Sequence, residues 1–153
     1  MIQVIFTRSS SFLSKIIRFL SKEPVSHVAI VFDNKIVFHS NLYGTHPDWY
    51  STFIRDNEII FILDYKYTLE QEEEIYLKIP QYDSRWYDFG GLFYFLWRGI
   101  LYRLFNVPIP KDNLFGKKDQ FLCTELAKII DPTLENLDMI TPYRVYIQLK
   151  EKL

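Results

Sequence analysis

The segment Gln120-Phe121-Leu122-Cys123-Thr124-Glu125-Leu126-Ala127 contains the chain's only cysteine. A helix-forming run from Thr124 to Ile130 follows the cysteine. A thiol in the first turn of a helix lies near unpaired backbone N–H groups and the positive end of the helix dipole, and both favour the thiolate. The sequence therefore predicts a nucleophile if a base lies nearby. From Cys123 alone, the alternative of a small buried apolar residue stays open.

Two histidines upstream are candidates for that base. Two runs rich in β-branched residues, Ser26–Phe32 and Lys35–Ser40, flank the dipeptide Asp33-Asn34, which tolerates positive φ. This pattern predicts a β-hairpin. His27 opens its first strand and His39 closes its second, so antiparallel pairing brings the two histidines to the same end of the sheet.

Composition limits the classes of protein that the chain can belong to. Its 153 residues predict a single domain, 1–153, and 48% apolar content is enough for a core. Aromatic residues make up 18%, which favours a thick core or an aromatic-lined groove. The net charge of −1 gives no reason to expect a nucleic-acid partner.

The cysteine content and the first residues bear on location. A single cysteine cannot form an internal disulfide, and Met1–Val4 lacks the start of a signal peptide. We therefore expect a cytoplasmic protein. No motif predicts a cofactor.

The first third of the chain predicts a buried strand, Ile2–Phe6, and then a helix. Ser9–Ser11 offers N-cap oxygens, and apolar residues recur with helical spacing from Phe12 to Leu20. The other face carries Lys15, Arg18 and Lys22. We interpret this basic face as solvated, with an anion or membrane contact as the alternative.

The segments after the hairpin alternate between polar and apolar character. Asn41–Asn57 is predicted to be a loop, and Glu58–Asp64 a third segment of sheet. Thr68 with Gln71 forms a capping-box pattern. Thr141-Pro142 predicts the start of a last helix, with threonine as N-cap and proline in the first turn.

The most apolar segment, Leu92–Phe105, is predicted to be a buried central helix. It is shorter than the ~20 residues that a bilayer span needs, and it would place Arg98 and Arg103 inside the membrane. The segment before it carries Tyr87-Asp88 and Gly91. We expect at most weak contact with a membrane surface.

The order of these motifs resembles a known family. Five motifs follow one another along the chain: Ser-His before four apolar residues, a second strand ending in a polar residue, Tyr-Asp-x-x-Gly, Cys-Thr-Glu and a final Thr-Pro. The chain is similar to the circularly permuted NlpC-type papain-like cysteine hydrolases, the branch with relatives of lecithin–retinol acyltransferase. It also looks similar to bacteriophage-encoded members, which would place it in the host cytoplasm. The resemblance implies an α+β fold with a small antiparallel sheet packed with helices, the cysteine at a helix N-terminus and the histidine on a strand.

Carried onto this sequence, the resemblance implies Cys123 as nucleophile, His27 as its base and His39 as the group that orients the base. Many bacterial relatives have a carboxylate at that third position, whereas acyltransferase-like members have a histidine. Tyr87 and Thr124 are the candidates for oxyanion or substrate contacts, and a core tyrosine explains Tyr87 equally well.

Three functions remain open on the sequence. The first is a cysteine peptidase or amidase-like hydrolase with a Cys–His–His triad, acting on an amide, thioester or ester in a peptide, protein or acyl substrate. The second is a lipid acyltransferase, and the third is a catalytically silent binding module on the same fold. A zinc site made of His27, His39, His46 and Cys123 lacks compact ligand spacing, so no metal is expected.

Overall fold

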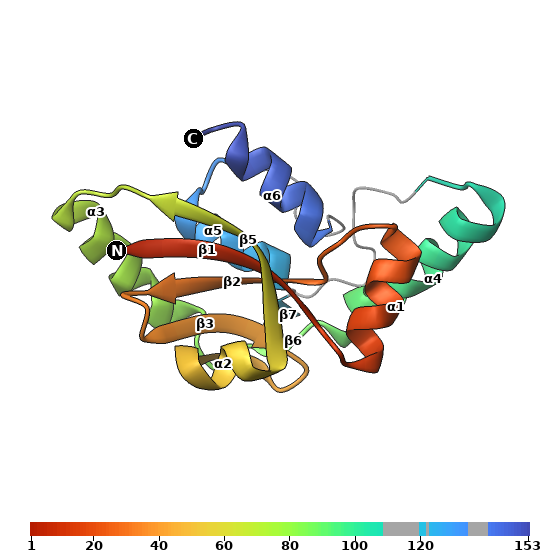
Figure 1. The fold of residues 1–153 in the computed structure, drawn as a ribbon, viewed down its shortest axis with the longest axis horizontal. Helices are drawn as coiled ribbons and strands as arrows, with labels where there is room; N and C mark the ends of the chain where they lie inside the picture. The colour runs from red at the N-terminus through yellow and green to blue at the C-terminus, as the bar shows by residue number, and fades with distance from the viewer. Residues whose placement is uncertain (109–119, 122, 135–140) are drawn as a thin grey trace.

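The computed structural model describes residues 1–108, 120–121, 123–134 and 141–153 of the chain. It confirms the coarse class, because helices pack around a five-stranded antiparallel sheet with the strand order β4-β3-β2-β1-β5 (Figure 1). A separate short parallel pair joins the two remaining strands, β6 and β7. The strands are β1 (Ile2–Ser9), β2 (His27–Phe32), β3 (Ile36–Asn41), β4 (Gly44–Trp49), β5 (Asn57–Tyr65), β6 (Trp86–Tyr87) and β7 (Gln120–Phe121).

The helices lie on both faces and at both ends of the sheet. In Figure 1, α3 lies at one end of the long axis, and α1 and α4 lie side by side at the other. The helices are α1 (Phe12–Ser21), α2 (Tyr50–Asp56), α3 (Leu69–Lys78), α4 (Phe89–Phe105), α5 (Ala127–Ile130), α6 (Pro142–Lys150) and the 3-10 turns η1 (Ile79–Gln81) and η2 (Cys123–Leu126).

Alternate residues of the central strand β2 enter two different cores, as the two-residue period of a strand requires. Val28, Ile30 and Phe32 belong to the larger core, which η2, α5, α6 and α3 complete. Ala29 and Val31 belong to a smaller core against α2. Because both faces are buried, β2 is apolar along nearly its whole length.

The predicted hairpin is confirmed as β2 and β3. Asp33 and Asn34 have φ values of 50° and 55°, in the left-handed region, and the Lys35 N–H donates to the Phe32 carbonyl at 2.9 Å. The register pairs Ala29 with His39. His27, two residues before Ala29, is therefore a diagonal neighbour of His39 on the same face.

The helix starts are also confirmed. Ser11 caps α1 by accepting from the Ser14 N–H, and Thr68 forms a complete capping box with Gln71 at α3. Thr141 caps α6 by accepting from the Arg144 N–H. These short-range motifs could be predicted from the sequence because the capping residue and its partner lie within one helical turn of each other.

The prediction of a loop over 41–57 is wrong, since this segment forms β4 and α2. β4 is the edge strand next to β3, and His46 pairs directly with His39. The polar and aromatic segment contains Gly44 and Pro47, which favour a loop, but an edge strand tolerates a proline because one row of its N–H groups needs no partner.

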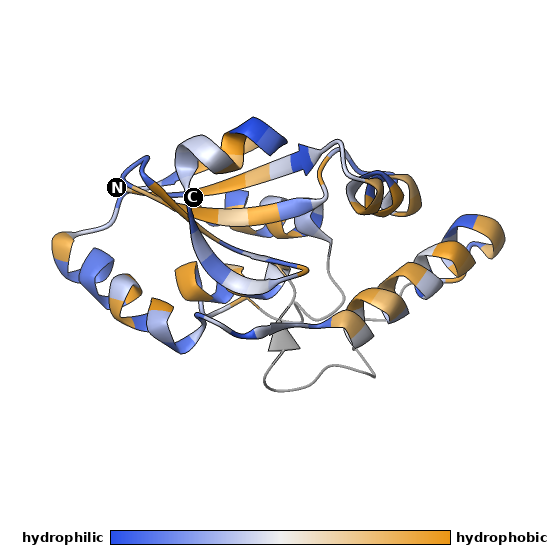
Figure 2. Cartoon of the chain, turned by 90° about the horizontal axis from the view of Figure 1, so that it is seen from below, coloured by the Kyte–Doolittle hydropathy of each residue, from blue (hydrophilic) through white to orange (hydrophobic). Residues whose placement is uncertain are grey.

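The prediction of a buried central helix at 92–105 is also wrong. α4 extends away from the sheet and packs against α1, where an added Cβ on Gly99 would lie 3.1 Å from the Leu20 Cβ (Figures 1 and 2). Phe93 is 75% exposed and Leu104 68% exposed. Among the described residues, no helix is long and apolar enough to cross a membrane.

We predict that Gly44→Ala destabilises the protein. Gly44 has a φ of 103°, and a Cβ there would lie 2.5 Å from the Arg85 carbonyl oxygen, which accepts the Thr45 N–H at 2.9 Å. The expected loss of free energy of unfolding is about 2–3 kcal/mol, measured by urea denaturation. Ser51→Ala, at an exposed position of α2, is the control and should stay within about 0.5 kcal/mol of wild type. An equally small change in Gly44→Ala would contradict the argument.

Candidate functional site

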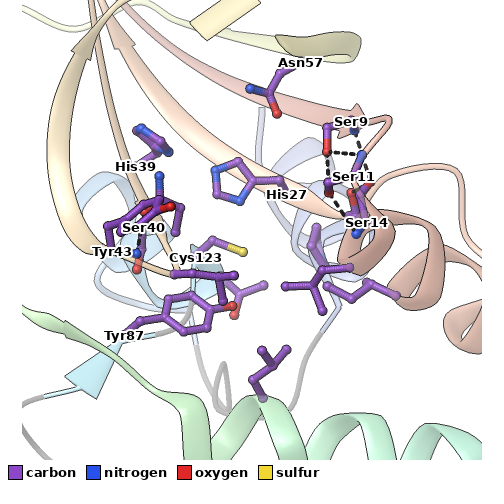
Figure 3. A pocket seen from close by; sticks show the side chains of 18 of the residues that line it. Ser9, Ser11, Ser14, His27, His39, Ser40, Tyr43, Asn57, Tyr87 and Cys123 are labelled. Carbon is purple, nitrogen blue, oxygen red and sulfur yellow. Dashed lines mark hydrogen bonds between the residues drawn. The ribbon is translucent and has the colours of Figure 1, made fainter.

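A cavity of about 310 Å³ lies where the end of the sheet meets α1 and α4. All five residues singled out from the sequence line it, namely His27, His39, Tyr87, Cys123 and Thr124. Figure 3 labels the first four of them. The described residues that line this cavity include no Asp, Glu, Lys or Arg. Its volume is at the lower end of the range for small-molecule sites, and its chemistry is that of uncharged polar and apolar groups.

Cys123 is the first residue of η2 and is buried in the larger core. Backbone N–H groups of Val28, Thr124 and Cys123 itself act on its sulfur and lower the thiol pKa. Burial is the larger effect and raises that pKa to about 11. The sequence-based expectation of a thiolate is therefore wrong for this structure, because the helical run is a 3-10 turn followed by four α-helical residues, and desolvation outweighs its N–H groups.

His27 is the side chain toward which the cysteine sulfur points (Figure 3). It lies at the first position of β2, directly before Val28, whose N–H acts on the sulfur. Burial, with smaller effects of His39 and His46, lowers the pKa of His27 to about 3. Thiol and imidazole are therefore both neutral at pH 7, and the unprotonated ring nitrogen of a neutral imidazole can act as a base.

His39 lies between two other imidazoles. Its ring centroid is 5.5 Å from that of His27 and 4.6 Å from that of His46, and Phe53 packs 5.0 Å away. Burial is the main cause that lowers the pKa of His39 to about 4. Nε2 of His27 and both ring nitrogens of His39 are buried without a hydrogen-bond partner in the described parts of the chain. Ring packing, rather than a hydrogen bond, sets the mutual orientation of the two histidines here.

Tyr87 reaches the cavity from β6, which pairs with the segment leading to the cysteine through the register Tyr87–Phe121. It is buried, and burial raises the pKa of its phenol far above the usual value. Asp88, the next residue, is the N-cap of α4 and accepts from the Gly91 N–H at 2.7 Å. The Tyr-Asp-x-x-Gly pattern thus includes a helix start, which explains its aspartate structurally.

A cluster of serine hydroxyls forms a wall of the cavity that the sequence reasoning missed. Ser14 and Ser26 share a hydrogen bond of 2.6 Å between their Oγ atoms, and those of Ser9 and Ser11 lie 2.8 Å apart (Figure 3). From the sequence, Ser9–Ser11 were recognised only as N-cap residues, and Ser26 only as the residue before His27. Its position directly before the candidate base was therefore known, but the hydrogen bond to Ser14, twelve residues away, depends on tertiary packing.

Apolar residues of α1 and α4 line another part of the cavity. These are Leu13, Ile17, Leu92 and Phe95. A helical period alone could not reveal this wall, since the same spacing also describes a helix packed on the sheet.

The grouping of histidines does not form a metal site. Among the residues that the structure describes, no three His, Cys, Asp or Glu side chains are arranged to hold a metal ion. The contacts of His39 with His27 and His46 are edge contacts between rings.

Comparisons with protein-family models, with curated proteins and with solved structures found no match. The interpretation of the site therefore depends on its own geometry.

We predict that alkylation of Cys123 by iodoacetamide is slow at neutral pH and rises about tenfold per pH unit up to a pKa of about 11. The chain has one cysteine, so intact mass reports this site alone. The control is protein unfolded in guanidinium chloride, whose labelling rate should level off above the ordinary thiol pKa of about 8.5. A rate that does not change between pH 5 and 8 would instead indicate a thiolate–imidazolium pair.

We also predict that stability falls between pH 7 and 5. The pKa values of His27 and His39 are lowered by folding to about 3 and about 4, so the unfolded chain binds more protons in this window. The contribution of each neutral histidine to the free energy of unfolding is fully present above the unfolded-state pKa near 6.5. At pH 5 this contribution is smaller by about 2 kcal/mol for each histidine.

Urea denaturation at the two pH values measures this loss. His39→Gln should remove about half of the pH dependence while His27 keeps its share. The window lies above the ordinary carboxyl pKa range, which limits the contribution of acidic residues. An unchanged free energy of unfolding at pH 5 would show that neither histidine is held neutral by burial.

Proposed function

We propose that this protein is a cysteine hydrolase with a permuted NlpC-type papain-like fold, acting on an amide, thioester or ester through Cys123, His27 and His39. The observation that supports this most directly is the cavity, into which the only thiol, two neutral imidazoles and backbone N–H donors converge. Nucleophilic catalysis needs a thiol, a base within reach and donors for the oxyanion.

In the proposed reaction, the Cys123 sulfur forms a bond to the substrate carbonyl carbon as its proton passes to His27. The carbonyl π electrons move to oxygen, and the backbone N–H groups of Cys123 and Thr124 are the candidate donors to this oxyanion. Collapse breaks the bond to the leaving group, which takes the proton from His27. Water then attacks the acyl-enzyme with His27 as base, releasing the acid and restoring the thiol.

The proposed role of His39 is to position His27. Its ring packs edge to face on that of His27, with Phe53 beside both rings. An imidazole cannot supply the negative charge that a carboxylate would bring to the imidazolium formed during attack. Burial also raises the thiol pKa and lowers the imidazole pKa, which opposes proton transfer between them. Both effects favour activated acyl groups, such as thioesters and esters, over amides.

Two other functions have specific support. The apolar wall of Leu13, Ile17, Leu92 and Phe95 would suit the acyl chain of a lipid acyltransferase, which passes the acyl group to an acceptor other than water. The neutral, buried thiol is equally compatible with a catalytically silent module that binds a ligand in the cavity without reacting with it.

We predict that p-nitrophenyl esters acylate Cys123, with p-nitrophenol released and a matching mass added to the protein. Cys123→Ala should show neither. His27→Ala should slow acylation by at least about 100-fold, because it removes the base, whereas His39→Ala should slow it by about tenfold, because only positioning is lost.

His46→Gln is the matched control, since His46 contacts the His39 ring but does not line the cavity. Its effect should be smaller than that of either other histidine variant. Circular dichroism verifies the fold of each variant. Binding of esters in the cavity without release of p-nitrophenol from wild type would favour the silent module. A His39→Ala defect larger than that of His27→Ala in folded protein would reverse the two assigned roles.

A further inference from the structure

α4 carries one continuous stripe of exposed apolar side chains. The stripe runs along the helix at spacings of four, four, three and four residues, which places its members on one face. With 17 residues, α4 is about 25 Å long, and the stripe follows most of it. The exposed fraction of the stripe's side chains runs from 39% at Ile100 to 75% at Phe93. The members are Phe89, Phe93, Trp97, Ile100 and Leu104.

α1 continues this apolar surface. Phe12 and Phe19 lie two helical turns apart on one side of α1 and are 78% and 61% exposed. Arg103 joins the two helices, because its guanidinium lies 4.7 Å from the centre of the Phe19 ring. On α4, Arg103 lies between Gly99, which faces α1, and the stripe. We call the stripe, Phe12 and Phe19 together the α1–α4 surface.

The charge of these helices differs from that of the rest of the chain. α1 and α4 contain Lys15, Arg18, Arg98 and Arg103 and no Asp or Glu. The chain carries −1 in total, so the residues outside these two helices carry −5 once the +4 of the helices is taken away. Four glutamates, Glu70 and Glu72–Glu74, lie in α3 at the opposite end of the long axis (Figure 1). The two helices that carry the exposed apolar side chains described above are therefore positively charged, whereas the rest of the chain is negative.

We propose that the α1–α4 surface binds an anionic lipid surface, with both helices lying along the headgroup layer. Exposed aromatic and aliphatic side chains would enter the acyl boundary while Lys and Arg contact lipid phosphates. α4 would lie on the membrane rather than cross it. This goes beyond the weak membrane-surface contact expected from the sequence, because the structure adds an exposed apolar area to the basic face of α1.

The charge pattern favours lipid over a second copy of the chain. Two copies meeting through this surface would bring the +4 of each helix pair together, which opposes association. An anionic surface attracts the same charges and repels the acidic α3 end, so it also selects the orientation. The inference goes beyond the proposed hydrolase function and does not depend on it, because the exposed side chains of the surface do not line the cavity.

The test is cosedimentation with vesicles of phosphatidylcholine alone and of phosphatidylcholine with equal phosphatidylglycerol. We expect binding to the anionic vesicles that weakens but persists in 1 M salt, where the Debye length falls to about 3 Å and mainly the apolar contribution remains. Phe93→Gln with Leu104→Gln should weaken partitioning at least about tenfold. Lys15→Gln with Arg103→Gln should weaken it about tenfold at low salt only.

The matched control is Leu69→Gln with Leu77→Gln on α3, where the side chains are 85% and 69% exposed but lie at the acidic end. This variant should bind like wild type. Cys123→Ala should also bind, which separates the result from the hydrolase proposal.

Three outcomes overturn the proposal: absence of binding to anionic vesicles, binding unchanged by Phe93→Gln with Leu104→Gln, or equal loss in the α3 control. Self-association that this α4 variant abolishes, without vesicle binding, would identify a second copy as the occupant instead.

Discussion

The contact between η2 and the start of β2 is the constraint on which the candidate site depends. Val28 fills the larger core with its side chain, while its N–H acts on the Cys123 sulfur. Residue 27 must then project to the other face of the sheet, where His39 and Phe53 pack against it. A single strand thus presents a backbone donor and an imidazole to the same cavity. A shift of one residue in the register of β2 would separate them.

Desolvation decides the resting chemistry of this site. The same burial that brings thiol and imidazoles together raises the pKa of Cys123 and lowers those of His27 and His39. Among the described residues lining the cavity there is no charged side chain, so no ionised group there compensates a buried charge. The three backbone N–H groups at the sulfur are fixed dipoles, so they can stabilise negative charge without themselves being ionised.

Patterns that act over a few residues were predictable from sequence. The hairpin at Asp33-Asn34 and the caps at Thr68 and Thr141 each depend on neighbours within one turn. The sequence also singled out the five residues that the structure brings to one cavity. The sequence could not reveal the raised pKa of Cys123, because burial depends on tertiary packing. It could not reveal β4 either, because a proline usually argues against a strand and is tolerated here only because β4 is an edge strand.

The error about α4 has a physical cause that bears on function. An apolar sequence indicates that a helix avoids water, but it does not say whether the partner is the protein's own core. α1 and α4 divide their side chains between two surroundings. Their inner residues, Leu13 and Phe95 among them, line the cavity, and Phe19 and Phe93 face outward. Because this helix pair is apolar on two sides and the protein covers only one of them, the other side is exposed to water. The packing of the protein on itself gives no reason for apolar side chains on that exposed side. Contact with an external apolar surface would bury them.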